Sequence, residues 1–443
     1  MKVAVVTGGS RGDVQPYIAL AVGLREAGHE PLLTTHEYFR PMVEERGLEF
    51  APLAGDPREA VFDWGSTQRL VDDGFHPVKY LRRGIELGHQ KLGRLWDDTF
   101  AACEGADAVI YAMWGWAAYH AAGHMGIPAI HANWGPNART RELPNVMLSA
   151  LTELIGSRPR SNLLTHAFLE QAFWLPFSSV VNERRRALGM TPIGREGIYS
   201  HLLAEQHPCL FGYSSSSVPK PRDWQPWHHV TGYWFLDLLE DYSPPPGLEE
   251  FLDAGPPPVF VGFGSMVADD EERAARTHAV IEAVESAGQR AVLECSGGAI
   301  GGVDLPETMH YISNVPYEWL WPRVAAVVHH GGAGSTAAGL RFGRPTVICP
   351  FAGDQFFWGQ RVARMGAGPE PVPIRKLTAE GFAEALRVAV SDTGIRERAA
   401  QIGAQIQAEH GVRTAVELFE RYSQRRFPAR PVQGATAQAA QTV

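Results

Sequence analysis

The sequence has few cysteines and no apolar run long enough to cross a bilayer. Its four cysteines are far apart and form no Cys-x-x-Cys pair, a pattern typical of buried thiols rather than of disulfides or a metal site. No apolar run approaches the ~20 residues that span a bilayer, and a strand pattern rather than a secretory signal follows Met1. We therefore expect a cytoplasmic protein without a membrane span.

The chain also lacks an excess of basic residues. Its formal net charge is −9, whereas proteins that bind nucleic acids carry a basic surface. A hydrophobic content of 45% with 20% charged residues is typical of a protein with a packed core. At 443 residues the chain is too long for one ordinary domain, so we expect two.

Apolar runs and helical patterns alternate in both halves of the chain. In the first half, strands are expected at residues 3–6, 31–35, 108–111 and 129–132, and a helix at 16–27. In the second half, strands are expected at 259–263, 290–295, 324–329 and 346–350, and helices at 274–286 and 335–342. Short apolar runs between helices indicate parallel sheets that are covered on both faces. The pattern predicts two doubly wound α/β domains that face each other across a cleft.

The expected domain boundaries follow from composition. An N-terminal domain is predicted at 1–216 and a C-terminal domain at 231–413, joined by a linker at 217–230 in a stretch rich in serine and proline. A helix at 414–426 is expected to cross back to the first domain. The tail at 427–443 is rich in Ala, Gln and Thr and is expected to be disordered.

Two glycine-rich loops follow apolar runs, one in each half. The first contains Gly8, Gly9 and Gly12, and the second spans residues 330–336. A strand that ends in glycines and leads into a helix leaves free backbone N–H groups at the positive end of the helix dipole, which suits a phosphate. Asp354 and Gln355 follow the second loop and are polar groups suited to the hydroxyls of a sugar. The combination predicts a site for a sugar nucleotide.

Residues 60–205 contain long helical patterns and many aromatic residues. Any one of these side chains can simply belong to the core, but as a group placed after strand ends they can form the wall of an apolar ligand site. The candidates for that wall are Trp114, Trp116, Trp134, Phe173 and Trp174.

These motifs resemble those of glycosyltransferases with the GT-B fold, in the family that includes plant natural-product, glycopeptide-antibiotic and sterol glucosyltransferases. Residues 9–16, Gly-Ser-Arg-Gly-Asp-Val-Gln-Pro, are similar to a signature of the sterol and glycopeptide branches. Residues 330–336, followed by Gly343-x-Pro345 and Pro350-x-x-x-Asp354-Gln355, resemble the donor-binding signature of the family. Both signatures occur in the family's order, and the resemblance extends over nearly the whole chain.

The resemblance implies a set of donor-binding residues. Ser265 would face the donor phosphates and sugar, the backbone of Val315 would pair with the base, and Asp354 and Gln355 would hold the hexose hydroxyls. The diphosphate would be held by His330, Gly332, Gly334 and Ser335, and Ser10 and Arg11 would reach the donor from the N-terminal domain. His329 is more simply a buried residue at the end of a strand.

Asp13 is the expected general base. It stands where plant members of the family have a histidine, and the sterol and glycopeptide branches carry Asp at the same place. A carboxylate is a weak base for an alcohol, but it suffices if the hydroxyl becomes acidic as the bond to an oxocarbenium-like centre forms. The alternative is that Asp13 only caps the following helix.

Two further features bear on the donor. Ala338 replaces a glutamate that binds the ribose in plant members, so the choice between UDP and dTDP stays open. No Asp-x-Asp triplet, the metal anchor of another glycosyltransferase fold, occurs in the chain. We therefore expect no metal site and no cofactor beyond the nucleotide sugar as co-substrate.

The expected function is an inverting transfer of a hexose, with glucose from UDP-glucose favoured, to a hydroxyl of a sterol, a steroid or a polycyclic natural product. The first alternative is a macrolide or polyketide glycosyltransferase that uses a dTDP-deoxysugar. More distant alternatives are a sugar-nucleotide epimerase and a non-catalytic helper protein. The expected partners are these two small molecules, with no nucleic acid and no membrane span, although a lipophilic acceptor would allow a transient contact with a membrane.

Overall fold

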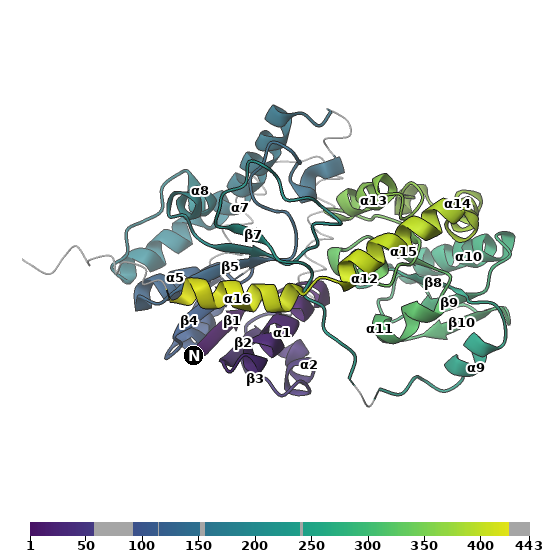
Figure 1. Cartoon of the computed structure of the whole chain (residues 1–443), viewed down its shortest axis with the longest axis horizontal. Helices are drawn as coiled ribbons and strands as arrows, with labels where there is room; N and C mark the ends of the chain where they lie inside the picture. Colours follow the sequence, from purple (N-terminus) through teal and green to yellow (C-terminus); the bar gives the residue numbers. More distant parts are fainter. Residues whose placement is uncertain (57–91, 114, 151–155, 240–241, 425–443) are drawn as a thin grey trace, which may run out of the picture.

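The structure is a computed structural model that describes residues 1–56, 92–113, 115–150, 156–239 and 242–424 (Figure 1). Trp114 and the expected tail at 427–443 lie outside the described residues. Two parallel sheets, each with helices on both faces, form the two halves of the molecule. Within the described ranges, no helix is both long and apolar enough to cross a membrane.

The N-terminal sheet contains seven parallel strands in the order β3-β2-β1-β4-β5-β6-β7. The strands are β1 (Lys2–Val6), β2 (Glu30–His36), β3 (Glu49–Leu53), β4 (Ala108–Tyr111), β5 (Ala129–Asn133), β6 (Cys209–Phe211) and β7 (His228–Val230). The helices of this half with both ends described are α1 (Arg11–Glu26), α2 (Arg40–Glu44), α5 (Trp116–Met125), α7 (Pro159–Ala187) and α8 (Gly197–Ala204), with 3-10 turns η1 (Glu37–Phe39) and η2 (Val146–Leu148). Residues 92–103 are also helical.

The C-terminal sheet contains five parallel strands in the order β10-β9-β8-β11-β12. The strands are β8 (Val259–Gly262), β9 (Ala291–Glu294), β10 (Met309–Ile312), β11 (Ala326–His329) and β12 (Thr346–Ile348). The helices after β7 are α9 (Leu248–Asp253), α10 (Asp270–Ser286), α11 (Tyr317–Leu320), α12 (Ala333–Arg341), α13 (Gln355–Arg364), α14 (Ala379–Ser391), α15 (Thr393–Gln407) and α16 (Gly411–Ser423), with 3-10 turns η3 (Trp321–Arg323) and η4 (Ile374–Lys376).

Strand β1 shows why both faces of the N-terminal sheet are covered. Val3 and Val5 belong to one apolar cluster, with side chains of α1 and α16, whereas Ala4 and Val6 belong to another on the opposite face. Side chains alternate between the faces of a strand, so a continuous apolar run requires a helix layer on each side. The expected α/β architecture with doubly wound sheets is therefore the one observed.

Both sheets change winding direction at an equivalent place. The order reverses between β1 and β4 in the N-terminal sheet and between β8 and β11 in the C-terminal sheet. Ligands of doubly wound sheets bind at such switch points, outside the carboxyl ends of the strands. The two glycine-rich loops leave β1 and β11 at these points.

The first helix begins earlier than the sequence predicted. We expected it at residues 16–27, because proline is favoured at the start of a helix. The structure begins α1 at Arg11 and places Pro16 inside it. A proline at this position removes only the hydrogen bond to the carbonyl of Gly12. Because the helix begins at Arg11, Asp13 lies in its first turn.

The expected linker at 217–230 is wrong. It contains β7, which pairs with β6 in the N-terminal sheet, so the connection between the sheets follows Val230. Ser214 and Ser217 lie in the stretch rich in serine and proline, but both are fully buried. Their hydroxyls are satisfied there: that of Ser214 donates to Glu409, and that of Ser217 donates to the Ser214 carbonyl. No observation fixes the remaining boundaries, which stay predictions.

The chain returns to the N-terminal half at its end. Helix α16 lies along α1 (Figure 1), and Val416, Phe419 and Tyr422 belong to the same apolar cluster as β1 and α1. The Tyr422 hydroxyl and the His229 Nε2 lie 2.8 Å apart. This helix therefore ties the two halves together through packing that is continuous with the N-terminal core.

Candidate functional site

Asp13 lies in the first turn of α1, and both of its roles considered from the sequence are compatible with its position. Its Oδ2 accepts the Ser10 backbone N–H and the Ser10 hydroxyl, each at 2.9 Å. Thr7 fixes the same turn, because its hydroxyl donates to the Asp13 carbonyl at 2.8 Å. Both side-chain bonds end on one oxygen, so the carboxylate can stabilise the helix start and still offer Oδ1 to a substrate.

Burial raises the pKa of Asp13, while the two bonds from Ser10 and an interaction with the Trp134 indole lower it. The net direction is upward, which makes Asp13 a stronger base than an exposed aspartate. A raised pKa at a carboxylate beside a candidate substrate site is what general-base catalysis needs.

The loop before Asp13 requires glycine. At Gly9, φ is +115°, and a Cβ there would lie 2.6 Å from Asp13 Oδ2. The Gly9 N–H donates to His36 Nε2 at 3.2 Å, and burial lowers the pKa of His36, which keeps the imidazole neutral and able to accept. His36 was not predicted from the sequence; the only available signal was its position at the end of a strand beside β1.

The second glycine-rich loop leads into α12, and its helix start faces that of α1. An ideal Cβ on Gly334 would lie 3.9 Å from the Gly12 Cα. The first N–H groups of α12, from Ala333, Gly334 and Ser335, have no partner within the helix because a helix leaves its first turn unpaired. The positive ends of two helices thus meet at one place, which favours an anion.

His330 lies in the tight space between two glycines. A Cβ on Gly264 would lie 2.6 Å from its Cε1, and one on Gly332 would lie 2.5 Å from its Nε2. Burial lowers the pKa of His330 to about 4, so the imidazole is neutral at pH 7. The Nδ1 atom is buried and has no hydrogen-bond partner among the described residues. A neutral imidazole has one N–H, so the unpartnered ring nitrogen of His330 can donate one hydrogen bond to a ligand.

His329 has a structural role. Its Nδ1 accepts the Gly331 N–H at 3.0 Å, and its ring stacks on Trp321 with centroids 6.0 Å apart. The bond to Gly331 shapes the turn into α12, so His329 supports the loop rather than facing a ligand.

Asp354 immediately precedes α13, and the Asp13 carboxylate affects its ionisation. Burial and the negative charge of Asp13 raise the pKa of Asp354 to about 7, against a smaller opposite effect of Trp358. The Trp358 indole N–H donates to Asp354 Oδ2 at 3.1 Å, which leaves Oδ1 for a ligand. The electrostatic effect requires the two carboxyl groups to be close, although one belongs to each half of the molecule.

Gln355 is oriented differently from the sequence-based expectation. Its Oε1 accepts the backbone N–H groups of Phe351 and Ala352, at 2.7 and 3.2 Å, and its Nε2 lies 3.7 Å from Met266 Sδ. The side chain is 7% exposed. Its carbonyl oxygen therefore holds the turn that presents Asp354, and only its N–H groups can reach a sugar.

Other predicted donor residues lie around the same strand ends. Ser265 is exposed after β8, and Val315 is buried after β10. Glu294 holds the turn before Val315, because its Oε1 accepts the Asn314 N–H at 3.4 Å. Asn314 has a φ of +56°. Glu294 had no sequence signal beyond its place at the end of β9.

Arg11 and Ser335 come together at Tyr317. Burial raises the pKa of Tyr317, while a hydrogen bond with Ser335 and the positive charge of Arg11, in the N-terminal half, act in the opposite direction. Arg11 is exposed and its Nε donates to Gln15 at 3.0 Å. The structure therefore places Ser10, Arg11 and Asp13 at the same junction as His330, Gly332, Gly334, Ser335 and Asp354.

The described members of the predicted acceptor wall do not form one surface: Trp116 and Trp174 belong to one apolar cluster of the N-terminal half, and Trp134 packs against another. Trp134 lies beside Asp13, as its effect on the carboxylate shows. Trp174 is 1% exposed in the N-terminal core, where its indole N–H donates to the Gly194 carbonyl. Trp116 packs edge-on against Tyr199. The positions of Trp174 and Trp116 favour the packing role considered from the sequence, and Phe173, on α7, is partly buried.

Two cavities lie elsewhere at the junction of the two halves. One of about 540 Å³ is lined by residues of α1 and α16 together with Arg341 and Glu409. The other, of about 410 Å³, lies between residues 142–149, 156 and 157 on one side and α13 on the other. In the described part of the chain, no group of three or more His, Cys, Asp or Glu side chains is arranged to hold a metal ion.

Comparison with family models agrees with this geometry. Residues 3–144 match the model described as the glycosyltransferase family 28 N-terminal domain. Residues 290–417 match the model described as erythromycin biosynthesis protein CIII-like, C-terminal domain. The two matches contain the two glycine-rich loops.

Curated relatives are similar over nearly the whole chain. A sterol 3-beta-glucosyltransferase of Komagataella phaffii is 38% identical over 430 residues, which is 94% of this chain and 34% of the relative. One from Emericella nidulans is 35% identical over 434 residues, which is 95% of this chain and 30% of the relative. The chain therefore spans about a third of the length of the curated relatives it matches.

Solved structures share the fold at lower identity. The glycotransferase of kitacinnamycin has a TM-score of 0.68 at 20% identity, with 95% of this chain and 98% of the other covered. The glycosyltransferase VinC in complex with DTDP has a TM-score of 0.64 at 18% identity, with 96% and 100% covered. Taken with the two family models and the two glycine-rich loops, these similarities show that the chain belongs to the glycosyltransferases with the GT-B fold.

Proposed function

We propose that this chain transfers a hexose from a nucleoside diphosphate to a hydroxyl of an apolar acceptor, with inversion at the sugar. The observation that carries the proposal is that the start of α1, with Asp13 in its first turn, meets the start of α12 from the opposite half, where an ideal Cβ on Gly334 lies 3.9 Å from the Gly12 Cα. Burial and the charge of Asp13 together raise the pKa of Asp354 to about 7, so both carboxyl groups belong to this junction. The pair adjoins two helix starts that favour an anion. A base, a sugar-binding carboxylate and a diphosphate site are the groups that this reaction requires.

In this mechanism Asp13 takes the proton of the acceptor hydroxyl as the new glycosidic bond forms and the bond to the diphosphate breaks. Its raised pKa helps, because the carboxylate is then a stronger base. The leaving diphosphate gains charge, which the N–H groups at the start of α12 and the neutral imidazole of His330 stabilise by hydrogen bonds. Asp354 accepts hydrogen bonds from hydroxyls of the sugar through Oδ1.

We propose glucose as the sugar and a sterol or a related polycyclic alcohol as the acceptor. The names of the curated relatives support both choices. The C-terminal half would bind the donor and the N-terminal half the acceptor. UDP-glucose is the first donor to test, and dTDP-glucose the second, because neighbours such as VinC are described in complex with DTDP. In the proposed step no metal or further cofactor takes part, since the N–H groups at the helix starts and the His330 imidazole donate hydrogen bonds to the diphosphate.

The test is an acceptor panel with one donor at a time. The purified chain is mixed with UDP-glucose or dTDP-glucose and hydroxysteroids or polyketide aglycones, with EDTA present, and products are identified by a mass gain of one hexose. The anomeric configuration of the product, determined by NMR, should be inverted relative to the donor. An epimerase would change the donor without any acceptor, and a helper protein would produce neither change; either result would reject the proposal.

A further inference from the structure

One loop of the N-terminal half extends from Asp13 to the turn before Asp354. Residues 134–148, here called the bridging loop, follow β5 and end with η2. At the start of the loop, the Trp134 indole affects the ionisation of Asp13. Near its end, the Met147 Cε lies 3.1 Å from an ideal Cβ on Gly353, the residue before Asp354. The bridging loop thus extends from the proposed base to the proposed sugar-binding residue.

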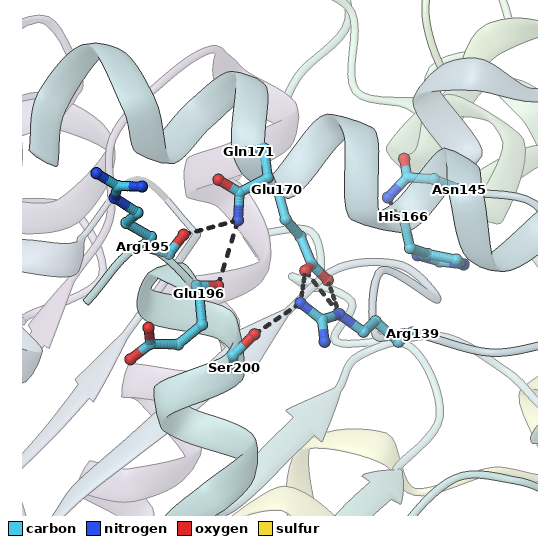
Figure 2. A network of polar contacts seen from close by, with 8 residues as sticks. All are labelled: Arg139, Asn145, His166, Glu170, Gln171, Arg195, Glu196 and Ser200. Carbon is cyan, nitrogen blue, oxygen red and sulfur yellow. Dashed lines mark hydrogen bonds and ion pairs between the residues drawn. The ribbon is translucent and has the colours of Figure 1, made fainter. Parts of the chain in front are cut away.

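The middle of the bridging loop is held by an ion pair with a buried carboxylate. The Arg139 Nε donates to both oxygens of Glu170, at 2.9 and 2.6 Å, and its Nη2 donates to Glu170 and, at 2.9 Å, to the Ser200 hydroxyl. Glu170 lies on α7 and is 7% exposed, and Ser200 lies on α8. Figure 2 shows the Arg139 guanidinium between these two helices.

Further bonds hold the rest of the loop to neighbouring elements. The Asn145 N–H donates to the Thr165 hydroxyl at 2.9 Å, and the Leu143 carbonyl lies 3.2 Å from His166 Nε2. Asn145 and His166 lie together on the same side of α7 as Glu170 (Figure 2). Asp223 accepts the Thr140 hydroxyl at 2.5 Å and the Arg141 N–H at 2.7 Å.

Glu170 is buried, whereas the Arg139 side chain is 33% exposed. A partly buried ion pair is a poor means of adding stability, because the loss of water around the charges offsets much of their attraction. A bidentate arginine–carboxylate pair does, however, fix one geometry. The acceptor hydroxyl must reach Asp13, so the segment beside Asp13 in the N-terminal half borders the acceptor. The ion pair therefore holds a segment whose position matters for the proposed reaction.

We infer that Arg139 and Glu170 are positioning residues for the acceptor: they hold the bridging loop in the geometry that brings the acceptor hydroxyl to Asp13, without contacting the donor. The inference rests on the proposed function. It predicts a change in acceptor use that a purely stabilising ion pair would not cause.

The experiment compares wild type with Glu170→Gln and Arg139→Lys, which keep the approximate size of each side chain but remove the paired geometry. Glu272→Gln is the matched control, since Glu272 forms a partly buried ion pair with Arg276 on α10 in the other half. The acceptor kcat/KM should fall by about 10- to 100-fold in both test variants. The KM for the nucleotide sugar should stay within about twofold of wild type, because Gln355 holds the turn before Asp354 and Trp358 holds Asp354 itself, both independently of the ion pair.

Amide hydrogen exchange provides a readout that does not depend on turnover. Exchange in residues 137–148 should become faster in both test variants, whereas residues 10–20 and 330–340 and the control variant should be unchanged. Unchanged exchange in the bridging loop would overturn the inference, as would an increase that spreads through both halves. A donor KM that rises as much as the acceptor KM would also overturn it. Absence of transfer by wild type would reject the proposed function, and the exchange results would still decide whether the ion pair fixes the loop.

Discussion

Replacing Asp13 with asparagine separates its two roles. Asparagine retains a side-chain carbonyl oxygen, which can accept the two bonds from Ser10 that Asp13 Oδ2 accepts at 2.9 Å. It cannot take a proton from the acceptor. The substitution therefore leaves the start of α1 intact and removes only the base.

The magnitudes follow from these contacts. Because both bonds from Ser10 are retained, the free energy of unfolding should change by no more than ~1 kcal/mol, the usual worth of a helix cap. General-base catalysis usually contributes ~10²–10⁴ in rate. The loss of the base should therefore raise the activation free energy by about 3–5 kcal/mol. The effect on rate is much larger than the effect on stability, so one variant distinguishes the roles.

The assay measures kcat for hexose transfer, the Kd for UDP or dTDP by calorimetry, and Tm for wild type and Asp13→Asn. We expect a folded, nucleotide-binding protein with little activity. In wild type, the rate should fall as the pH drops through the raised pKa of Asp13, because only the carboxylate can take the proton. An Asp13→Asn protein with the activity of wild type would show that Asp13 only stabilises the helix, and the proposed mechanism would be wrong.

Other predictions concern the donor. His330→Ala should lower kcat by ~10²–10³, the effect of losing one hydrogen-bond donor to a developing charge, and EDTA should not change the rate; full activity in this variant or strict dependence on a divalent ion would contradict the diphosphate site. If Asp354 accepts hydrogen bonds from the sugar hydroxyls, at least one donor in the series with 2-, 3-, 4- or 6-deoxyglucose should show a large loss of kcat/KM relative to the glucose donor; equal efficiency across the series would exclude that role. In the unliganded protein, a pKa of about 7 means that protonation of Asp354 stabilises the fold. This contribution to the free energy of unfolding is fully present below about pH 4, the usual pKa of an aspartate, and is lost as the pH rises through 7. The Tm difference between wild type and Asp354→Asn should therefore change over that range, and a constant difference would refute the raised pKa.

The sequence predicted the central strands of both sheets and the glycine-rich loops because their signals are local, but it predicted no strand at β3, β6, β7 or β10. Apolar runs alternate with helical patterns along the chain, and glycines mark the turns where strands lead into helices. It failed where local signals mislead. Strands β6 and β7 have three residues each, too few to show an alternation of apolar and polar residues. The stretch around Ser214 and Ser217 resembles a linker in composition, and the burial of Ser214 depends on Glu409, which is distant in sequence.

The sequence alone therefore determined two doubly wound units, the loops that suit a diphosphate, and the identity of Asp13 and Asp354 as candidate site residues. Only the tertiary structure decided how these residues act. Asp13 and Asp354 come from different halves, and the charge of Asp13 acts on Asp354 only when the halves pack together. The neutral state of His330 arises from burial, because desolvation disfavours the charged imidazole. The structural role of the Gln355 carbonyl depends on the turn it binds, and the order of residues along the chain does not specify that contact.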